Sequence, residues 1–321
     1  MNSLQDLYSS HDGKVSDKWN LYIKEYDRLL NDYRNIPISL LEIGIQNGGS
    51  LEIWAEYFNQ ATSLIGCDIN LDCHQLKYAN PKISVVVGDS SHPETLNQIF
   101  GLSENFDIVI DDGSHRSKDI IHAFASLFPA INLGGIFIAE DLHCSYWEEF
   151  EGGLFDRNSS ISFFKSLADI VNFQHWGVSK TRSQLLNHFC AKYSISFNEE
   201  DLAEIHSVEF INSMCVVRKK SVSACELGNR FVAGKEELVV QGHAKAHLTS
   251  YEIRNETRNP LSQDVIEDSS YVDALLKELQ DKTEKIHQLD DEVQVLKQTI
   301  RKNRLSKLIK QIFKNSFTGS K

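Results

Sequence analysis

The feature that most constrains the fold is an alternation of short apolar runs with amphipathic stretches. The runs are rich in β-branched residues and lack polar alternation, which is typical of strands covered on both faces by helices. Five of them occupy residues 38–44, 62–69, 83–89, 106–113 and 135–141. Repeated strand and helix patterns predict an α/β fold with a doubly wound, parallel, Rossmann-like sheet.

Further elements flank this repeat. Residues 16–33 place aromatic and leucine side chains at helical spacing, which predicts a helix before the first strand. Two later runs, 205–211 and 213–220, are separated by Asn212, and we expect them to close the sheet as an antiparallel pair. The sequence therefore predicts one α/β domain over residues 1–220.

The composition fits an intracellular globular protein. Of the 321 residues, 41% are hydrophobic, which is enough for a sizeable core. Six cysteines without CxxC pairs predict reduced thiols, and the N-terminus lacks the apolar segment of a signal peptide, so we expect a cytoplasmic location. The net charge of −12 argues against nucleic acid as a partner of the main body.

The pattern changes after residue 220. Residues 221–268 are expected to be a linker or small extension. Residues 269–303 carry a heptad whose a positions are all apolar, and this predicts a parallel two-stranded coiled coil, hence a homo-oligomer. The alternative is a single long helix packed on the main domain. The a positions are Val272, Leu279, Ile286, Val293 and Ile300.

The last segment, 304–321, is predicted to form a basic amphipathic helix. From 301 to 321 the chain has seven Lys and Arg residues and no acid. Such a helix can lie on an anionic membrane surface, which would place the protein at the inner membrane face. The alternative is a solvated helix that continues the oligomer.

Polar and small residues follow the first three predicted strands. Ligands of doubly wound sheets bind at these carboxyl ends. The turn after the first strand lacks the GxGxxG fingerprint of dinucleotide sites, and an acidic pocket suits the cationic sulfonium of S-adenosylmethionine better than a pyrophosphate. The candidate cofactor-binding residues are Glu42, Gly44, Gly48, Ser50, Asp68 and Asp89.

Pairs of acids follow the fourth and fifth predicted strands, in "VIDDGSH" (109–115) and "GIFIAEDLH" (135–143). If these strands are neighbours, Asp112, Glu140 and Asp141 converge. Such carboxylates repel one another unless a cation lies between them, and oxygen ligands favour Mg²⁺, with Mn²⁺ or Ca²⁺ as alternatives. Asp111 is expected to face the cofactor side instead.

Three segments resemble a known family. "LLEIGIQNGGSLEIWAEYF", "FDIVIDDGSH" and "GGIFIAEDLHCSYW" are similar to the metal-dependent sugar O-methyltransferases of macrolide biosynthesis, the macrocin and mycinamicin enzymes, and the resemblance spans residues 16–220. It implies that the three converging acids bind the metal and that His115 is the general base. It also implies that Lys18 and Tyr22 approach the cofactor from the N-terminal helix.

The same resemblance implies an acceptor loop. In "HCSYWEEFEGGLFDR" (143–157), Tyr146 and Trp147 would stack on a sugar face, although ordinary packing of aromatic side chains is the alternative. The implied function is S-adenosylmethionine- and Mg²⁺-dependent O-methylation of a sugar hydroxyl on a glycan or glycoconjugate, such as a surface polysaccharide. The alternatives are a non-sugar vicinal diol as acceptor, or a coiled-coil assembly protein with an inactive methyltransferase domain.

Overall fold

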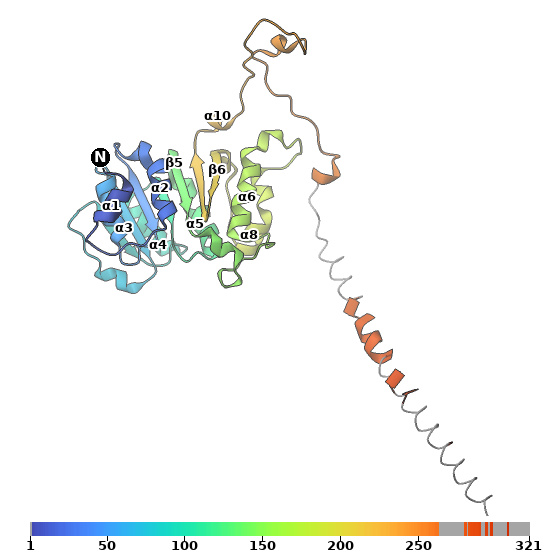
Figure 1. Cartoon of the computed structure of the whole chain (residues 1–321), viewed down its shortest axis with the longest axis horizontal. Helices are drawn as coiled ribbons and strands as arrows, with labels where there is room; N and C mark the ends of the chain where they lie inside the picture. The colour runs from blue at the N-terminus through green and yellow to red at the C-terminus, as the bar shows by residue number, and fades with distance from the viewer. Residues whose placement is uncertain are drawn as a thin grey trace, which may run out of the picture. The chain divides into compact units, whose positions relative to one another are not determined.

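The computed structural model describes residues 2–262, 279–280, 282–289, 293–294, 296–297 and 307. The chain divides into two compact units, Met1–Arg258 and Asn259–Lys321 (Figure 1). The first unit contains every residue that the sequence associates with the cofactor, the metal or the acceptor.

A seven-stranded sheet forms the centre of the first unit, in the order β3-β2-β1-β4-β5-β7-β6. The first five strands run parallel, and β7 pairs antiparallel with both β5 and β6. This confirms the predicted Rossmann-like sheet. The strands are β1 (Ser39–Ile43), β2 (Ser63–Asp68), β3 (Ile83–Val87), β4 (Phe106–Asp111), β5 (Ile131–Ala139), β6 (Ile205–Ile211) and β7 (Met214–Lys219).

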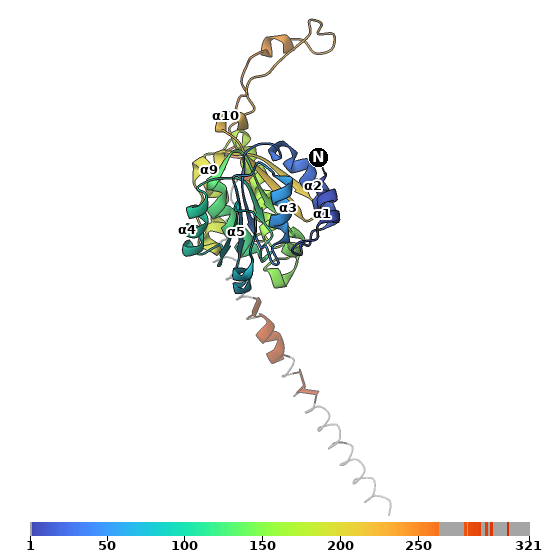
Figure 2. The ribbon, with the colours of Figure 1, turned by 90° about the vertical axis from the view of Figure 1, so that its left-hand side faces the viewer.

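Helices cover both faces of the sheet, as the continuous apolar strands require (Figure 2). Alternate side chains of one strand enter opposite cores, so Leu40 packs under one helical layer and Leu41 under the other. The first layer contains α1 (Leu4–Ser10), α2 (Asn20–Leu30) and α3 (Gly49–Tyr57). The second contains α4 (Pro93–Leu102), α5 (Ser117–Leu127), α6 (Ser160–Val171), α8 (Asn187–Tyr193) and α9 (Glu199–Ala203).

Short elements complete the described chain. Two are single turns of α-helix, α7 (Arg182–Leu185) and α10 (Val222–Cys225). The 3₁₀ turns are η1 (Asn31–Tyr33), η2 (Leu71–Gln75), η3 (Phe128–Ala130), η4 (Leu142–Tyr146), η5 (Glu148–Phe150), η6 (Phe173–His175), η7 (His243–Ala246) and η8 (Pro260–Ser262). The six cysteines all lie in the described range and are free thiols.

The N-terminal helix begins later than its periodicity predicts. Helix α2 starts at Asn20, and Trp19 at its N-cap makes no side-chain capping bond. The expected first turn is irregular because the Lys18 side chain lies among buried carboxylates and Trp19 donates to Asp141. Tertiary contacts therefore override the local helical pattern before residue 20.

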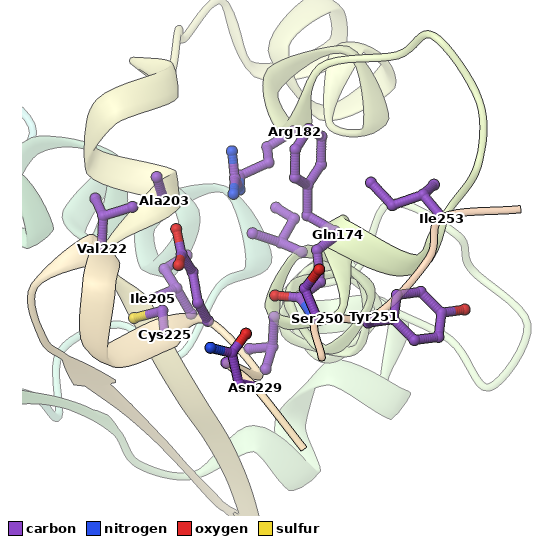
Figure 3. Close-up of a pocket in the computed structure, with 15 residues that line it drawn as sticks. Gln174, Arg182, Ala203, Ile205, Val222, Cys225, Asn229, Ser250, Tyr251 and Ile253 are labelled. Carbon is purple, nitrogen blue, oxygen red and sulfur yellow. The ribbon is translucent and has the colours of Figure 1, made fainter. Parts of the chain in front are cut away.

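The segment after β7 has little regular structure of its own. It returns to the second helical layer, where Glu256 N donates to Gly177 O at 2.8 Å. Tyr251 and Ile253 line a cavity of about 380 Å³ together with Gln174 and residues of α7 and α10 (Figure 3). No helix within the described residues is long and apolar enough to cross a membrane.

Part of the predicted coiled coil lies within the described residues. Its described apolar a and d positions have helical backbone and are 42–62% exposed. They are Leu279, Ile286, Leu289, Val293 and Leu296. The other apolar heptad positions, and the predicted basic helix except Lys307, lie outside the described residues.

Candidate active site

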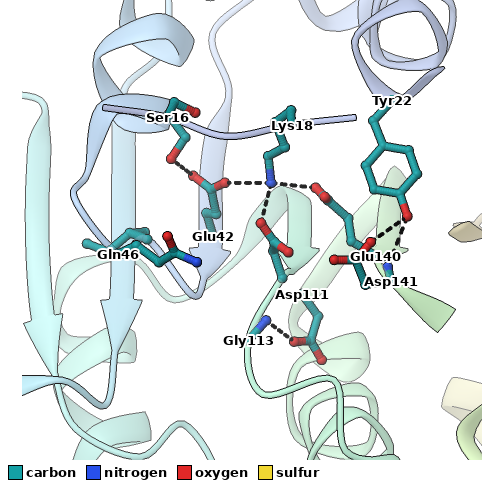
Figure 4. Close-up of polar contacts among 12 residues, drawn as sticks. Ser16, Lys18, Tyr22, Glu42, Gln46, Asp111, Gly113, Glu140 and Asp141 are labelled. Atoms are coloured by element: carbon teal, nitrogen blue, oxygen red, sulfur yellow. Dashed lines mark hydrogen bonds and ion pairs between the residues drawn. The ribbon is translucent and has the colours of Figure 1, made fainter. Parts of the chain in front are cut away.

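The ends of β1, β4 and β5 bring the predicted acids together. Asp111 is in register with Ala139, so the residues that follow each strand lie side by side. Backbone hydrogen bonds link the ends of these three strands. Asp112 N donates to Ile43 O, and Glu140 N donates to Asp111 O, both at 2.9 Å. The convergence predicted from adjacent strands is therefore present (Figure 4).

A lysine ammonium lies among these acids. Lys18 Nζ is 2.5 Å from Asp112 Oδ2, 2.7 Å from Glu140 Oε1 and 3.5 Å from Glu42 Oε1, and its side chain is 3% exposed (Figure 4). Burial lowers the pKa of Lys18, but the three carboxylates raise it well above its usual value. The Lys18 ammonium is therefore buried and charged, and it contacts all three carboxylates.

Glu140 is the most enclosed of the predicted metal ligands. Its Oε1 accepts hydrogen bonds from Lys18 Nζ and from the Tyr26 hydroxyl. Burial raises the pKa of Glu140 to about 8, against the opposing effect of the Lys18 charge. Both contacts involve the same carboxylate oxygen, Oε1.

Glu42 and Ser50 form a buried hydrogen-bonded pair beneath the turn that joins β1 to α3. Ser50 Oγ donates to Glu42 Oε2 at 2.7 Å, and Trp54 Nε1 donates to the same oxygen at 3.2 Å. Burial raises the pKa of Glu42. Glu42, Gly48 and Ser50 do not line the cofactor-side cavity described below, and their contact with a cofactor remains a prediction.

Asp112, His115 and Asp141 form a group with metal-binding geometry. Each offers one ligand atom within 4.8 Å of the others. His115 Nε2 is 3.6 Å from Asp141 Oδ2, while His115 Nδ1 is buried without a hydrogen-bond partner among the described residues. Two carboxylates and an imidazole with an unpaired nitrogen fit a divalent cation.

The backbone is strained at two of these positions. His115 has φ +59° and Asp141 has φ +52°, in the left-handed region that costs a non-glycine residue about 1–3 kcal/mol. Asp141 is held there by Trp19 Nε1 and Tyr22 OH, which donate to its Oδ1 at 3.1 and 2.8 Å. Tyr22 thus contacts a predicted metal ligand, whereas the sequence associated it with the cofactor.

A cavity of about 220 Å³ opens at the ends of β1 to β4. Its wall includes four of the predicted cofactor residues together with Gln46, Ile69, Ser90, Asp112 and Asp119. It is lined by backbone turns and acids, which suits a cationic cofactor with hydroxyl groups. The four predicted residues are Gly44, Asp68, Asp89 and Asp111.

Asp68 organises the first turn of this cavity. Its Oδ2 accepts hydrogen bonds from Ile45 N and Gln46 N, at 3.0 and 2.8 Å, and its Oδ1 accepts from Asn70 N at 2.9 Å. Both oxygens therefore bind the backbone. The contact of Asp68 with a cofactor remains a prediction.

Asp111 and Asp89 have pKa values that are shifted in opposite directions. Burial raises the pKa of Asp111 to about 7, and its Oδ2 has no hydrogen-bond partner among the described residues. At Asp89, hydrogen bonds from Ser91 outweigh the effect of burial and lower the pKa. The cavity thus contains an unpaired buried acid oxygen, which fits a cofactor that donates hydrogen bonds or carries positive charge.

Two cavities of about 400 and 320 Å³ adjoin the predicted acceptor loop and share His143, Asn212 and Ser213. We call them the acceptor-side cavities. Tyr146 lines the smaller cavity. Trp147 lines neither, but it is 51% exposed and its ring packs edge-on against His143 with a centroid distance of 5.1 Å. The predicted acceptor residues therefore lie beside His143.

Other contacts at the site come from residues that the motifs did not mark. Tyr26, Trp19 and Ser213 bind Glu140, Asp141 and His143, respectively. Trp19 and Tyr26 have the helical spacing of core residues, and Ser213 lies in the turn between two strands. Their polar atoms carry no pattern that separates them from ordinary packing.

No protein-family model matches the chain. Several curated proteins do match the chain. The chain is 36% identical over 164 residues to the 8-demethyl-8-alpha-L-rhamnosyl tetracenomycin-C 2'-O-methyltransferase of Streptomyces olivaceus, covering 48% of this chain and 42% of that protein. It is 34% identical over 182 residues to the demethylmacrocin O-methyltransferase of Streptomyces fradiae, covering 53% and 45%. Identity to the mycinamicin VI 2''-O-methyltransferase of Micromonospora griseorubida is 35% over 173 residues, covering 50% and 42%.

The match spans less than half the length of these relatives. Among solved structures, the MycE methyltransferase of the mycinamycin pathway, in complex with Mg, SAH and mycinamycin VI, matches 69% of this chain and 54% of its own. The TM-score is 0.56 at 27% identity. The curated relatives of this chain are thus sugar O-methyltransferases of the macrocin, mycinamicin and tetracenomycin kind, and the resemblance predicted from its three motifs is confirmed.

Proposed function

We propose that the chain is an S-adenosylmethionine- and Mg²⁺-dependent O-methyltransferase that acts on a sugar hydroxyl of a glycan or glycoconjugate. The observation that carries the proposal is the group of Asp112, His115 and Asp141. Asp112 also lines the cofactor-side cavity, and Asp141 accepts hydrogen bonds from Trp19 and Tyr22, which line an acceptor-side cavity. The names of the relatives support the sugar acceptor, and the MycE complexes support the cofactor and the ion.

In this proposal Asp112, Glu140 and Asp141 would hold the ion, as the sequence predicts. Glu140 shares the Lys18 ammonium with Asp112 but does not belong to the group of Asp112, His115 and Asp141. Mg²⁺ held by these residues would supply Lewis acidity and would orient vicinal sugar hydroxyls. His115 accepts the hydroxyl proton at Nε2, and Asp141, 3.6 Å away, stabilises the resulting imidazolium. The hydroxyl oxygen forms a bond to the sulfonium methyl carbon as the carbon–sulfur bond breaks, which leaves S-adenosylhomocysteine.

The chain contributes mainly alignment to this transfer. The backbone bonds between the ends of β1, β4 and β5 fix the turn that faces the cofactor relative to the acids that face the acceptor. Fixed geometry of this kind lowers the entropic part of the barrier. The rings of Trp19, His143 and Trp147, which pack edge-on against one another, would form the wall against which a sugar packs.

The proposal is tested by transfer of labelled methyl groups to sugar nucleotides, polysaccharide, lipid-linked glycan and a catechol, with and without EDTA. We expect Mg²⁺-dependent transfer to a sugar acceptor. His115→Ala should lower kcat by about 10²–10⁴-fold and leave cofactor binding intact. The exposed His74→Ala is the matched control. Transfer that is insensitive to EDTA, or strongest to the catechol, would contradict the proposal.

We also propose that two copies of the chain pair through residues 269–303. The described a and d side chains are exposed, and a parallel partner would cover them. Charges support this orientation: in register, Lys285 and Glu292 at g positions face Asp290 and Lys297 at e positions of the second copy. Light scattering of the full chain should give the mass of two copies.

For residues 304–321 we propose binding to an anionic membrane surface, which would bring the enzyme to lipid-linked acceptors. The support is the run of basic residues without acids from 301 to 321. The full chain should sediment with phosphatidylglycerol vesicles, and a chain ending at residue 300 should remain in the supernatant. Equal sedimentation of both chains would contradict this part of the proposal.

A further inference from the structure

Lys18 lies at the centre of the candidate site, yet the proposed methyl transfer assigns it no part. Its ammonium contacts three carboxylates that come from the ends of three neighbouring strands: Glu42 from β1, Asp112 after β4 and Glu140 after β5. Lys18 itself belongs to none of these strands and comes from the irregular segment before α2. It thus connects elements that are far apart in the sequence.

The charge balance at this point is unfavourable without a cation. Three acids converge within 3.5 Å of one ammonium, and the side chains of Lys18, Glu42 and Glu140 are at most 3% exposed. Carboxylates in such surroundings repel one another, and removing the single cation would leave buried charge uncompensated. Lys18 therefore contributes charge that a metal ion would otherwise have to supply.

The contacts of Lys18 use only one oxygen of Asp112 and one oxygen of Glu140, which leaves the other oxygens for an ion. Lys18 binds Asp112 through Oδ2 and Glu140 through Oε1, so the second oxygen of each carboxylate lies outside its contacts. Asp141 is not among its partners and is held instead by Trp19 and Tyr22. An ion at the acids would then lie close to a like charge, which weakens its binding.

We propose that Lys18 is a positioning residue that assembles the acids of the site before the ion binds and keeps ion binding weak and reversible. This inference rests on the proposed function, because it concerns the same metal site. It predicts that the fold is stable without Mg²⁺ when Lys18 is present and depends on Mg²⁺ when its charge is removed.

The segment that carries Lys18 is anchored independently of its side chain. Gly49 N donates to Val15 O at 3.2 Å, and Lys14 donates to Glu52 through its backbone N at 2.8 Å and through Nζ at 2.6 Å. A substitution at position 18 should therefore change the charge of the site while the backbone path remains.

The test compares thermal unfolding of the wild type and Lys18→Met, as full chains, in EDTA and in Mg²⁺, together with Mn²⁺ binding by electron paramagnetic resonance. In EDTA the variant should unfold at a lower temperature than the wild type, and Mg²⁺ should raise its melting temperature more. Its Mn²⁺ affinity should be tighter by at least ~10-fold, since a like charge near the ion is gone. Lys18→Arg should resemble the wild type, and Lys24→Met, at an exposed position of α2, controls for loss of a lysine outside the site.

The possible results distinguish failure of the proposed metal site from failure of the proposed role of Lys18. A wild type that neither binds Mn²⁺ nor responds to Mg²⁺ overturns the metal site and this inference with it. A wild type that responds, with Lys18→Met responding equally or less, overturns the role of Lys18 alone. Folding of Lys18→Met only in the presence of Mg²⁺ would support the inference most strongly. Failure of Lys18→Met to fold even in Mg²⁺ would overturn the inference.

Discussion

At the scale of single residues, two adjacent acids have different surroundings. The Asp111 carboxylate is fully buried and keeps one oxygen unpaired at the cofactor-side cavity. The Asp112 carboxylate contacts Lys18 and belongs to the group with metal-binding geometry. Side chains of successive residues at a strand end point in opposite directions, which explains how one dipeptide can serve two sites.

Asp111→Asn should separate these two functions. We expect binding of S-adenosylhomocysteine, measured by isothermal titration calorimetry, to weaken by about tenfold because an acceptor oxygen facing the cavity becomes an amide. Mn²⁺ binding should be unchanged. The exposed Asp72→Asn is the control. Weaker Mn²⁺ binding with normal cofactor binding would mean that the two acids have been assigned the wrong way round.

Gly44 is the second residue whose identity follows from geometry. It has φ +83°, and a Cβ there would lie 2.0 Å from the carbonyl oxygen of Asp112. Gly44→Ala should lower the free energy of unfolding by more than the ~1–3 kcal/mol of backbone strain, because Asp112 must also move. Gly101→Ala, in α4 with no described atom within 4 Å of its Cβ, should instead add about 0.5–1 kcal/mol. Urea unfolding of both variants measures the contrast.

At the scale of elements, the periodicity of the sequence predicts the sheet well and the N-terminal segment poorly. Four of the five parallel strands lie within their predicted ranges, because helices cover their apolar residues on both faces, a property that their own residues express. Strand β5 begins at Ile131, four residues before its predicted start, and residues 132–134 of this added part are exposed, so no apolar run marks it. Residues 16–19 have a helical pattern but are irregular, because their side chains bind partners after β4 and β5.

The same reasoning explains which site residues could be found. Asp112, Glu140 and Asp141 follow two apolar runs, so their convergence could be inferred once the strands were taken as neighbours. The ammonium of Lys18 lies 94 and 122 residues away in sequence from Asp112 and Glu140, and no local pattern reports such a contact. Resemblance to a family marked Lys18, but it did not say which groups it touches.

The ion pair between Lys14 and Glu52 joins the irregular segment to α3, and its contribution should depend on pH. Partial burial raises the pKa of Glu52, but hydrogen bonds and charge from Lys14 outweigh this and leave it below the usual value. A lowered folded pKa adds stability above the unfolded value of about 4.5, and this stability is lost as the pH falls through the folded pKa.

Glu52→Gln should therefore lower the melting temperature at pH 7 by about 2–4 °C, for a loss of about 1 kcal/mol. The difference from the wild type should shrink as the pH falls below about 4, where Glu52 is protonated in both states. Glu56→Gln, on the same helix and exposed, is the control. A difference that is the same at pH 3 and pH 7 would rule out the charge as its cause.

At the scale of the whole molecule, an enzyme-like unit precedes a heptad whose described seam is exposed. The matches to the curated relatives cover 48–53% of this chain, and their names do not describe a heptad. The association of copies has to be argued from the chain's own residues, above all from the a and d spacing.

Ile286→Lys should convert the predicted dimer to a monomer. A lysine at a central a position would be buried against its copy in the seam, and the cost of desolvating two like charges exceeds the gain from packing. Light scattering coupled to size exclusion measures the mass, and Gln288→Lys, outside the seam, should remain a dimer. Methyl transfer by the monomer should continue, because every candidate site residue lies in the first unit.

The close approach of Gly44 to the carbonyl of Asp112 has one more consequence. The turn beside the cofactor and the acid beside the ion touch through backbone atoms, so neither can shift without displacing the other. Occupancy of one site should then alter affinity at the other, and thermodynamic reciprocity requires the factor to be the same in both directions. The cofactor and the ion would therefore bind cooperatively rather than independently.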